Sequence, residues 1–454
     1  MLRAASAAFL ALVMVSCSGG LSQVREGEGW TRVFEDGIPD FDLEVAPLAG
    51  GDSVQVRLGL IPAALVFRPV EEGYRAWFRY LIRVDQRVVA EESDSLTMRS
   101  LEETRSYERV LKALVFGWGE SENPRLEVLL TDMNTERTAT RAQVQIWESV
   151  GQARVGRVLI EADGRPLVGL EYPASAMSFA AAATVVAETA GCAHWRLLSV
   201  PTDTLRAPLP FSLSPSLGSA VYRGAMYGNA DALHVASLPL AAGSGVATWT
   251  LQSGFPLGTY RVEIGWTESC GQAPLPPPSP RAIGPGRSFL VRPNGYPRIT
   301  HLGSMIDALG YIATEDEVER IKSAGDAMAR KGEFDAFWGR IVGDPVAASR
   351  VLEQLFSRVE EANRRFSAFK EGWKTDRGMV YIVMGPPLYS EDSVDQLRWY
   401  YSYDERNAGR YFIFDRVRGH PDELDMPHYV LKRSMEQEIE WRLAVRRWRS
   451  GLAR

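Results

Sequence analysis

Residues 345–384 read PVAASRVLEQLFSRVEEANRRFSAFKEGWKTDRGMVYIVM and combine two periodic patterns. In the first part, Val351, Leu355 and Val359 recur every four residues, which predicts a helix with one apolar stripe. The second part ends in the short apolar run Met379–Met384, which favours a buried strand. A long helix that leads into a strand indicates an α+β domain in this part of the chain.

Helix signals continue upstream of this stretch. Thr314 followed by Glu317 is a capping box, and Asp344 before Pro345 is an N-cap with proline at the first helical position. Downstream, aromatic strands are expected at Leu397–Tyr401, Tyr411–Phe414 and His428–Leu431. We therefore expect helices packed with a small antiparallel sheet over residues 297–432, and a basic C-terminal helix over residues 433–454.

The heptad Gly372-Trp-Lys-Thr-Asp-Arg-Gly378 lies between the long helix and the expected strand. It resembles the GWxTD motif, after which a domain family of bacterial exported proteins is named. Further similar segments are Leu309–Ile312, Phe337–Trp338, Arg358–Phe366, Gly385-Pro-Pro387, Trp399 with Tyr401, and Phe412 with Phe414. The resemblance covers about residues 300–432. One segment departs from the family pattern. The family often has Thr and Asn-Glu between its Asp-Pro and Arg-Val segments, whereas residues 346–353 of this sequence keep only the Glu, as Glu353.

The motif residues can all have structural roles. Gly372 is expected to end the long helix in the left-handed conformation, and Trp373 to fill the core at that corner. Thr375 and Asp376 can close a turn through side-chain bonds to the backbone. Gly378 would open the following strand. Gly385, Pro387, Trp399 and Tyr401 complete the set of motif positions that we regard as structural or binding residues.

A functional interpretation of the motif remains open beside the structural one. Asp376, Arg377 and Glu353 could form a polar cluster that grips a ligand, and the two carboxylates could act as an acid/base pair. The sequence contains no nucleophile elbow, P-loop, HExxH motif or Cys/His dyad. It also contains no His and Cys residues at the spacings typical of metal sites. We therefore expect no catalytic residues, no metal site and no cofactor.

Upstream of this domain the sequence predicts all-β structure in two units, over residues 37–149 and 150–296. In the first unit, Ser53–Leu58 and Tyr74–Val84 alternate polar and apolar residues. In the second, a Pro-x-Gly-x-Tyr turn leads into an alternating strand within Phe255–Ile264, and Arg287–Arg292 is its expected partner. Short strands of period two separated by turn residues predict immunoglobulin-like sandwiches.

The N-terminus predicts export and lipidation. Residues 1–16 have a short positive start and an apolar stretch too short to span a bilayer, as in a signal peptide. The sequence Met14-Val-Ser-Cys17 resembles the lipobox of bacterial lipoproteins, which implies that Cys17 carries the lipid. Residues 17–36 are polar and Gly-rich, and we expect them to form a lipidated tether to the first folded unit.

With Cys17 lipidated, two cysteines remain, Cys192 and Cys270. An exported protein would place them in an oxidising compartment, where disulfides form. We expect them to form a disulfide within the second β unit, although two unrelated buried thiols are the alternative. The net charge of −6 argues against a nucleic-acid partner, because a protein that binds nucleic acid is expected to carry a stripe of basic residues.

Together these patterns predict an envelope lipoprotein, anchored to a bilayer through Cys17 with its folded part outside the cytoplasm. The lack of Asp after Cys17 favours the outer membrane over the inner one. The expected role is that of a non-catalytic scaffold or adaptor that binds another envelope protein. A weaker similarity supports this role, since the Gly385-Pro-Pro and aromatic strand pattern is similar to small outer-membrane assembly lipoproteins, which are adaptors. The alternative is an enzyme or glycan-binding protein with a polar site around Asp376, Arg377 and Glu353.

Overall fold

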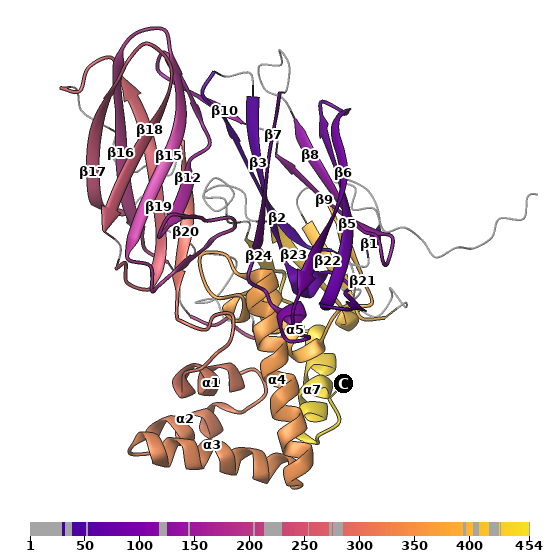
Figure 1. Ribbon diagram of the computed structural model, residues 1–454. Helices are drawn as coiled ribbons and strands as arrows, with labels where there is room; N and C mark the ends of the chain where they lie inside the picture. Colours follow the sequence, from indigo (N-terminus) through magenta and orange to yellow (C-terminus); the bar gives the residue numbers. More distant parts are fainter. Residues whose placement is uncertain are drawn as a thin grey trace, which may run out of the picture.

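The computed structural model places β-strands along most of the chain and helices near its C-terminus (Figure 1). The structure describes residues 30–31, 39–50, 53–117, 125–143, 146–202, 205–212, 229–252, 254–271, 275, 285–393, 396–402, 408–416, 426 and 428–453. Cys17, the expected signal peptide and most of the expected tether lie outside these residues. Among the described helices, none is long and apolar enough to cross a membrane.

The first β unit consists of two sheets that share one hydrophobic core. The smaller sheet contains β2 (Phe41–Pro47), β3 (Ser53–Leu60) and β7 (Val110–Gly117). The larger contains β4 (Arg68–Val70), β5 (Gly73–Val84), β6 (Arg87–Met98), β8 (Leu126–Asp132) and β9 (Arg137–Gln143). Alternate residues of β3 and β5, including Val56, Phe78 and Tyr80, enter the core. Strand β6 was not predicted from the sequence, because most of its side chains face solvent and carry no apolar alternation.

The second β unit repeats this layout with more strands. One sheet contains β10 (Trp147–Val150), β11 (Ala153–Gly156), β12 (Leu159–Ala162), β13 (Arg165–Pro166), β15 (Ser178–Ala187) and β18 (Gly243–Gln252). The other contains β14 (Glu171–Pro173), β16 (Gly191–Val200), β17 (Asp231–Leu240), β19 (Gly258–Thr267) and β20 (Gly286–Arg292). The pairings are antiparallel except for β14 with β20. The expected boundary between residues 149 and 150 falls inside β10, whose Trp147 packs in the first core.

The two β units contact each other through polar groups as well as apolar ones. Glu44 on β2 is buried and forms ion pairs with Arg57 of its own unit and with Arg287 on β20. The Thr184 hydroxyl on β15 donates to the Pro47 carbonyl at 2.5 Å. Because buried charges are costly unless they are paired, this contact fixes how the two units meet.

The C-terminal region contains α-helices and a third set of strands. The helices are α1 (Leu302–Leu309), α2 (Glu315–Ser323), α3 (Ala327–Val342), α4 (Pro345–Phe366), α5 (Asp376–Met384) and α7 (Gln437–Arg449). The sheet contains β1 (Trp30–Thr31), β21 (Tyr389–Asp392), β22 (Gln396–Tyr400), β23 (Tyr411–Arg416) and β24 (Tyr429–Leu431). The capping box at Thr314 and the Asp344 cap are both present, as the sequence predicted.

Two sequence expectations for this region are wrong. The run Met379–Met384 is helical and belongs to α5, because Thr375 caps the helix and the apolar side chains of Met379, Val380 and Ile382 are buried on all sides. A continuous apolar run is compatible with a helix that is buried on every face as well as with a buried strand, so periodicity alone does not distinguish the two. Within residues 17–36, expected only as a tether, Trp30–Thr31 pairs with β21 of the C-terminal sheet. An edge strand offers unpaired backbone groups that any chain segment can bind.

The chain is therefore mainly β-structure in several sheets, with its α-helices in the C-terminal region.

Candidate functional site

The GWxTD heptad forms a tight corner between α4 and α5. Helix α4 ends at Phe366, and Gly372–Lys374 forms a single 3₁₀ turn, η4. The Thr375 hydroxyl donates to the Gly372 carbonyl at 2.7 Å and accepts from the Gly378 N–H at 3.0 Å. Thr375 thus closes the turn with its donor and starts α5 with its acceptor, which is the role of an N-cap residue.

Both glycines of the heptad are required by close backbone contacts. A Cβ on Gly372 would lie 1.9 Å from the Ala362 carbonyl oxygen, and one on Gly378 would lie 1.9 Å from the Gly372 carbonyl oxygen. Neither glycine has a positive φ. The expectation that Gly372 ends the helix in the left-handed conformation is therefore wrong, as is the expectation that Gly378 opens a strand. The motif needs glycine because no side chain fits, not because of backbone handedness.

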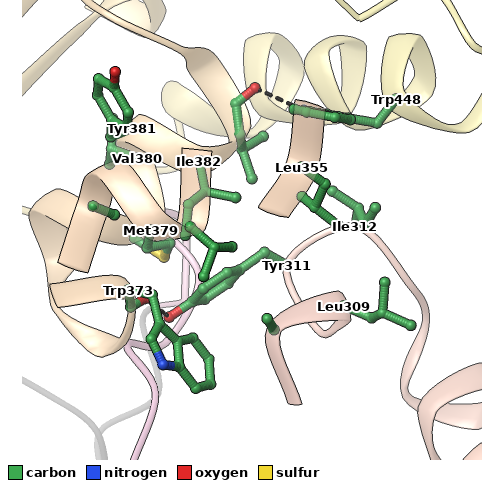
Figure 2. Packing of buried hydrophobic residues seen from close by; sticks show 14 of the residues in the cluster. Leu309, Tyr311, Ile312, Leu355, Trp373, Met379, Val380, Tyr381, Ile382 and Trp448 are labelled. Carbon is green, nitrogen blue, oxygen red and sulfur yellow. Dashed lines mark hydrogen bonds between the residues drawn. The ribbon is translucent and has the colours of Figure 1, made fainter. Parts of the chain in front are cut away.

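Trp373 fills the core at this corner and is 1% exposed. Its backbone N–H donates to the Asn363 side-chain oxygen at 3.1 Å, and its backbone carbonyl accepts from the Tyr311 hydroxyl at 3.0 Å. The indole and the Tyr311 ring meet edge to face, and Figure 2 shows both beside Met379 of α5. Through these contacts Trp373 joins α5 to α4 and to the segment after α1.

Asp376 is buried at the start of α5 and binds the far end of the C-terminal sheet. One carboxylate oxygen accepts from Arg433 Nη2 at 2.5 Å, and the other accepts from the Leu431 N–H at 2.8 Å. Arg433 also donates to the Pro208 carbonyl at 3.1 Å. Both oxygens of Asp376 are therefore used inside the protein, in a charge-assisted pair with a cation that sequence reasoning did not identify.

Arg377 points toward a different set of side chains. Its guanidinium lies 4.4 Å from the centre of the Tyr429 ring and 5.2 Å from that of Phe366. Nearby His428 is held neutral, since burial lowers its pKa to about 3 and the charges of Lys370 and Arg377 act in the same direction.

Glu353 does not join this corner. It is exposed on α4, thirteen residues before Phe366, which corresponds to about 20 Å along the helix axis. The structure therefore separates Glu353 from Arg377, which lies against Phe366. It likewise gives Asp376 a cation partner rather than a second carboxylate. The expected three-residue cluster does not form.

The remaining motif positions support the same corner from its other side. Gly385 ends α5 with a φ of 85°, and its carbonyl accepts from the Tyr401 hydroxyl at 2.7 Å. Pro387 is buried, and Trp399 is 1% exposed with its ring 5.4 Å from that of Phe366. Trp399 belongs to the core that contains Trp373, and Tyr401 packs against that core.

The C-terminal helix α7 is part of this core as well. The Trp448 indole donates to the Val383 carbonyl at 3.0 Å, as Figure 2 shows, and the Arg358 guanidinium stacks on its ring at 4.9 Å. Arg449 forms a two-pronged ion pair with Glu317 of α2, with both N–O distances at 2.8 Å. This pair lowers the pKa of Glu317 to about 2.

A segment of the second β unit covers the motif corner. Residues 205–211 lie between β16 and β17 in the sequence, yet Ala207 belongs to the C-terminal core. The Ala207 N–H donates to the Lys374 carbonyl at 2.9 Å, and the Lys370 ammonium donates to the Leu205 carbonyl at 2.9 Å. We call residues 205–211 the covering segment. No local periodicity marks this segment in the sequence, so its position over the motif was not predicted.

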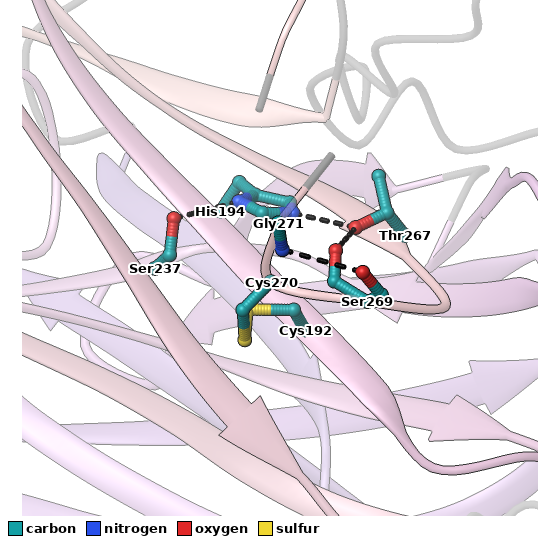
Figure 3. Close-up of a disulfide and its surroundings, with 7 residues drawn as sticks. All are labelled: Cys192, His194, Ser237, Thr267, Ser269, Cys270 and Gly271. Carbon is teal, nitrogen blue, oxygen red and sulfur yellow. Dashed lines mark hydrogen bonds between the residues drawn. A yellow bond between two sulfur atoms is a disulfide. The ribbon is translucent and has the colours of Figure 1, made fainter. Parts of the chain in front are cut away.

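The disulfide expected between Cys192 and Cys270 is present in the second β unit, with a Cα–Cα distance of 5.1 Å. Figure 3 shows it beside His194, whose ring nitrogens bond the Ser237 and Thr267 hydroxyls at 2.8 and 2.6 Å. Burial lowers the pKa of His194. Each polar atom of this buried imidazole therefore has a partner, as buried groups require.

In the described part of the chain, no group of three or more His, Cys, Asp or Glu residues could hold a metal ion. The corner itself consists of a buried ion pair, a capped helix start and an aromatic core, all of which join elements of the protein to one another.

These features define a mainly β protein with several sheets, whose described α-helices lie in the C-terminal region. Residues 282–450 match the GWxTD domain family, so this part of the chain is a GWxTD domain. The match extends beyond the expected residues 300–432 and takes in β20 and α7. No curated protein matches the chain significantly.

Among solved structures, the crystal structure of red sea bream transglutaminase matches with 9% identity and a TM-score of 0.17. The match covers 56% of this chain and 31% of that one. The chain thus spans under a third of that protein's length, and no conclusion about activity follows from the match.

Proposed function

We propose that this protein is a lipid-anchored envelope lipoprotein that serves as a non-catalytic scaffold or adaptor for another envelope protein. The anchor in this proposal is acylated Cys17, with the folded part outside the cytoplasm and the outer membrane as the favoured site. The proposal also takes residues 37–149 and 150–296 as immunoglobulin-like sandwiches, because in each unit two sheets share one core. Such modules commonly present sheet edges and loops to partners.

The observation that carries the non-catalytic role is the internal use of the motif's polar groups. Asp376 bonds Arg433 and the Leu431 backbone, and the Thr375 hydroxyl bonds two backbone groups of its own turn. A catalytic acid or base must reach a substrate proton within hydrogen-bond distance. Asp376 is only 7% exposed and lies under the covering segment, so its geometry suits a structural joint.

The interlocking of the units supports a scaffold in a second way. The second β unit packs Leu198, Val200 and Leu290 against Phe369 near the motif corner, and the Thr259 hydroxyl donates to the Phe369 carbonyl at 3.0 Å. The Tyr107 ring of the first unit meets Arg364 of α4. A motif that fixes several units in one arrangement would present a composite surface of constant shape, which favours binding by pre-organisation.

The alternative of an enzyme or glycan-binding protein would require Asp376, Arg377 and Glu353 to converge. Asp376 is buried in an ion pair and Glu353 is exposed on α4, so the geometry does not favour that alternative.

The proposal is tested by membrane fractionation and crosslinking in the bacterium that encodes the protein. The wild type should sediment with membranes, carry a lipid-dependent mass shift and give a discrete crosslinked adduct with an envelope protein. Cys17→Ser should be released to the soluble fraction and lose the adduct. Membrane binding that is unchanged in Cys17→Ser, with no lipid on the wild type, would contradict the anchor. A wild type that gives no adduct would contradict the adaptor role.

A further inference from the structure

A crevice of about 610 Å³ lies where the first β unit meets the GWxTD domain. On one side it is bounded by the short 3₁₀ turns η1 (Pro62–Ala64) and η2 (Glu103–Arg105) and by the start of β5. On the other side it is bounded by Arg298, just before α1, and by Arg364 on α4. The motif corner does not contribute to its lining, so the crevice is a separate feature.

The wall formed by the first β unit is apolar and aromatic. Leu65, Phe67, Tyr74 and Tyr107 line it, and Leu101 stands at its rim with half of its surface exposed. An exposed leucine beside several aromatic rings is a surface that a partner's apolar side chain can cover. This wall would therefore take an apolar or aromatic side chain.

The opposite wall and the rim carry positive charge. Among the residues that the structure describes, Arg105, Arg298 and Arg364 line the crevice and no carboxylate does. Arg364 is held in place from behind by Glu360 and Glu361. Arg298 lies 3.6 Å from Glu360 and its side chain is 75% exposed. Arg105 is exposed, and its side chain has no ion-pair partner among the described residues. Guanidinium groups in this setting select carboxylates, which they bind bidentately.

We propose that this crevice binds an extended acidic peptide segment of the partner, in which a carboxylate side chain meets Arg105 and Arg298 and a neighbouring apolar side chain rests against Phe67, Tyr74 and Leu101. The inference rests on the proposed adaptor function and names the chemistry of its partner. The crevice suits a chain segment because small-molecule sites bury most of their ligand, whereas both rims here are exposed.

The test measures binding of a short fluorescein-labelled peptide, in which Glu alternates with Phe and Leu, to the purified full chain without its signal peptide. The wild type should raise the fluorescence anisotropy of the peptide, and added salt should weaken binding because the contact is partly electrostatic. The same peptide with Gln in place of Glu should bind about tenfold more weakly or not at all. Equal binding of the Gln peptide would overturn the proposal.

Two variants and one control locate the site. Arg105→Glu and Leu101→Asp each put negative charge on an exposed rim position, so the fold should be unchanged and binding should weaken about tenfold or more. Arg87→Glu makes the same charge change at the far end of the β5–β6 hairpin, about 35 Å from the Tyr74 end. If Arg87→Glu weakens binding as much as Arg105→Glu does, the effect is one of overall charge and the crevice is not the site.

A photoreactive side chain at position 101 separates this inference from the proposed function. In cells it should crosslink the same envelope partner that chemical crosslinking finds, and Arg105→Glu should reduce that adduct. If the partner is found but never crosslinks from position 101, the crevice proposal fails while the adaptor role stands. If the peptide binds as described but cells yield no partner by any reagent, the adaptor role fails while the crevice remains a peptide site.

Discussion

Asp376 and Arg433 form a buried ion pair that joins the first turn of α5 to the chain just after β24. Their side chains are 9% and 14% exposed, respectively. Because the same arginine also bonds the Pro208 carbonyl, the pair connects the GWxTD domain to the covering segment of the second β unit. The heptad therefore contributes to the arrangement of whole units as well as to one turn.

Removing either partner of this pair should be costly. Arg433→Ala leaves the Asp376 carboxylate buried without its cation, and we expect a loss of about 3–5 kcal/mol in the free energy of unfolding. The exposed helical pair of Arg442 with Glu438 provides the control, since Arg442→Ala should cost well under 1 kcal/mol. Urea titration followed by circular dichroism measures both. Equal stability of the two variants would contradict a structural role for Asp376.

Trp373→Ala should destabilise the GWxTD domain by about 3–5 kcal/mol, because it empties a fully buried position. Met328, which is 84% exposed on α3, supplies a control, and Met328→Ala should change the unfolding free energy by less than about 0.5 kcal/mol. Thermal unfolding distinguishes the two. A Trp373→Ala protein that melts like the wild type but no longer captures its partner would instead place Trp373 in a binding surface.

Gly372→Ala should prevent normal folding of the corner, since its new methyl group would overlap the Ala362 carbonyl. Gly339→Ala is the matched control in α3, where a Cβ meets nothing within 4 Å. That variant should be more stable by roughly 0.5–1 kcal/mol, because alanine favours the helix interior. Opposite signs for these two substitutions are expected in denaturant titrations. A neutral Gly372→Ala would show that the corner is less tightly packed than described.

The Glu317–Arg449 pair should make stability depend on pH in the acid range. The folded-state pKa of Glu317 is lowered from 4.5 to about 2, so its stabilising contribution is complete above about pH 4.5 and is lost as the pH falls toward 2. Glu317→Gln keeps a capping-box side chain but removes the charge. Its stability should fall less than that of the wild type between pH 5 and pH 2, roughly the titration window. Parallel curves would exclude this carboxylate as a source of acid sensitivity.

Cys192→Ser with Cys270→Ser should lower the free energy of unfolding of the second β unit. The bond closes a loop with a sequence separation of 78, for which the chain-entropy relation gives about 4.5 kcal/mol. Denatured, unreduced wild type should not react with iodoacetamide at these two cysteines, whereas reduced protein should react at both. Labelling of both residues without reductant would show that the thiols are free.

The local sequence was sufficient to predict many of the elements. Strands β3 and β5 follow the expected runs, because their alternation reflects one face in a core and one outside it. The helix α4 was predicted for the same kind of reason, since its buried residues recur at helical spacing. Strand β20 follows the run that was expected to pair with the strand within Phe255–Ile264, although its residues 287–291 are all buried. The cysteine pair followed from counting, and the GWxTD domain from the spacing of several short segments.

What the sequence by itself determined were features that depend on a residue and its near neighbours: alternation, helical stripes, caps and the motif. The tertiary structure decided the rest. It made Met379–Met384 helical, because a run that is apolar at every position fits burial in either conformation. It gave Asp376 a partner 57 residues away, and it placed the covering segment of another unit over the motif. Such partners depend on how distant elements pack, and no local period of the sequence records that choice.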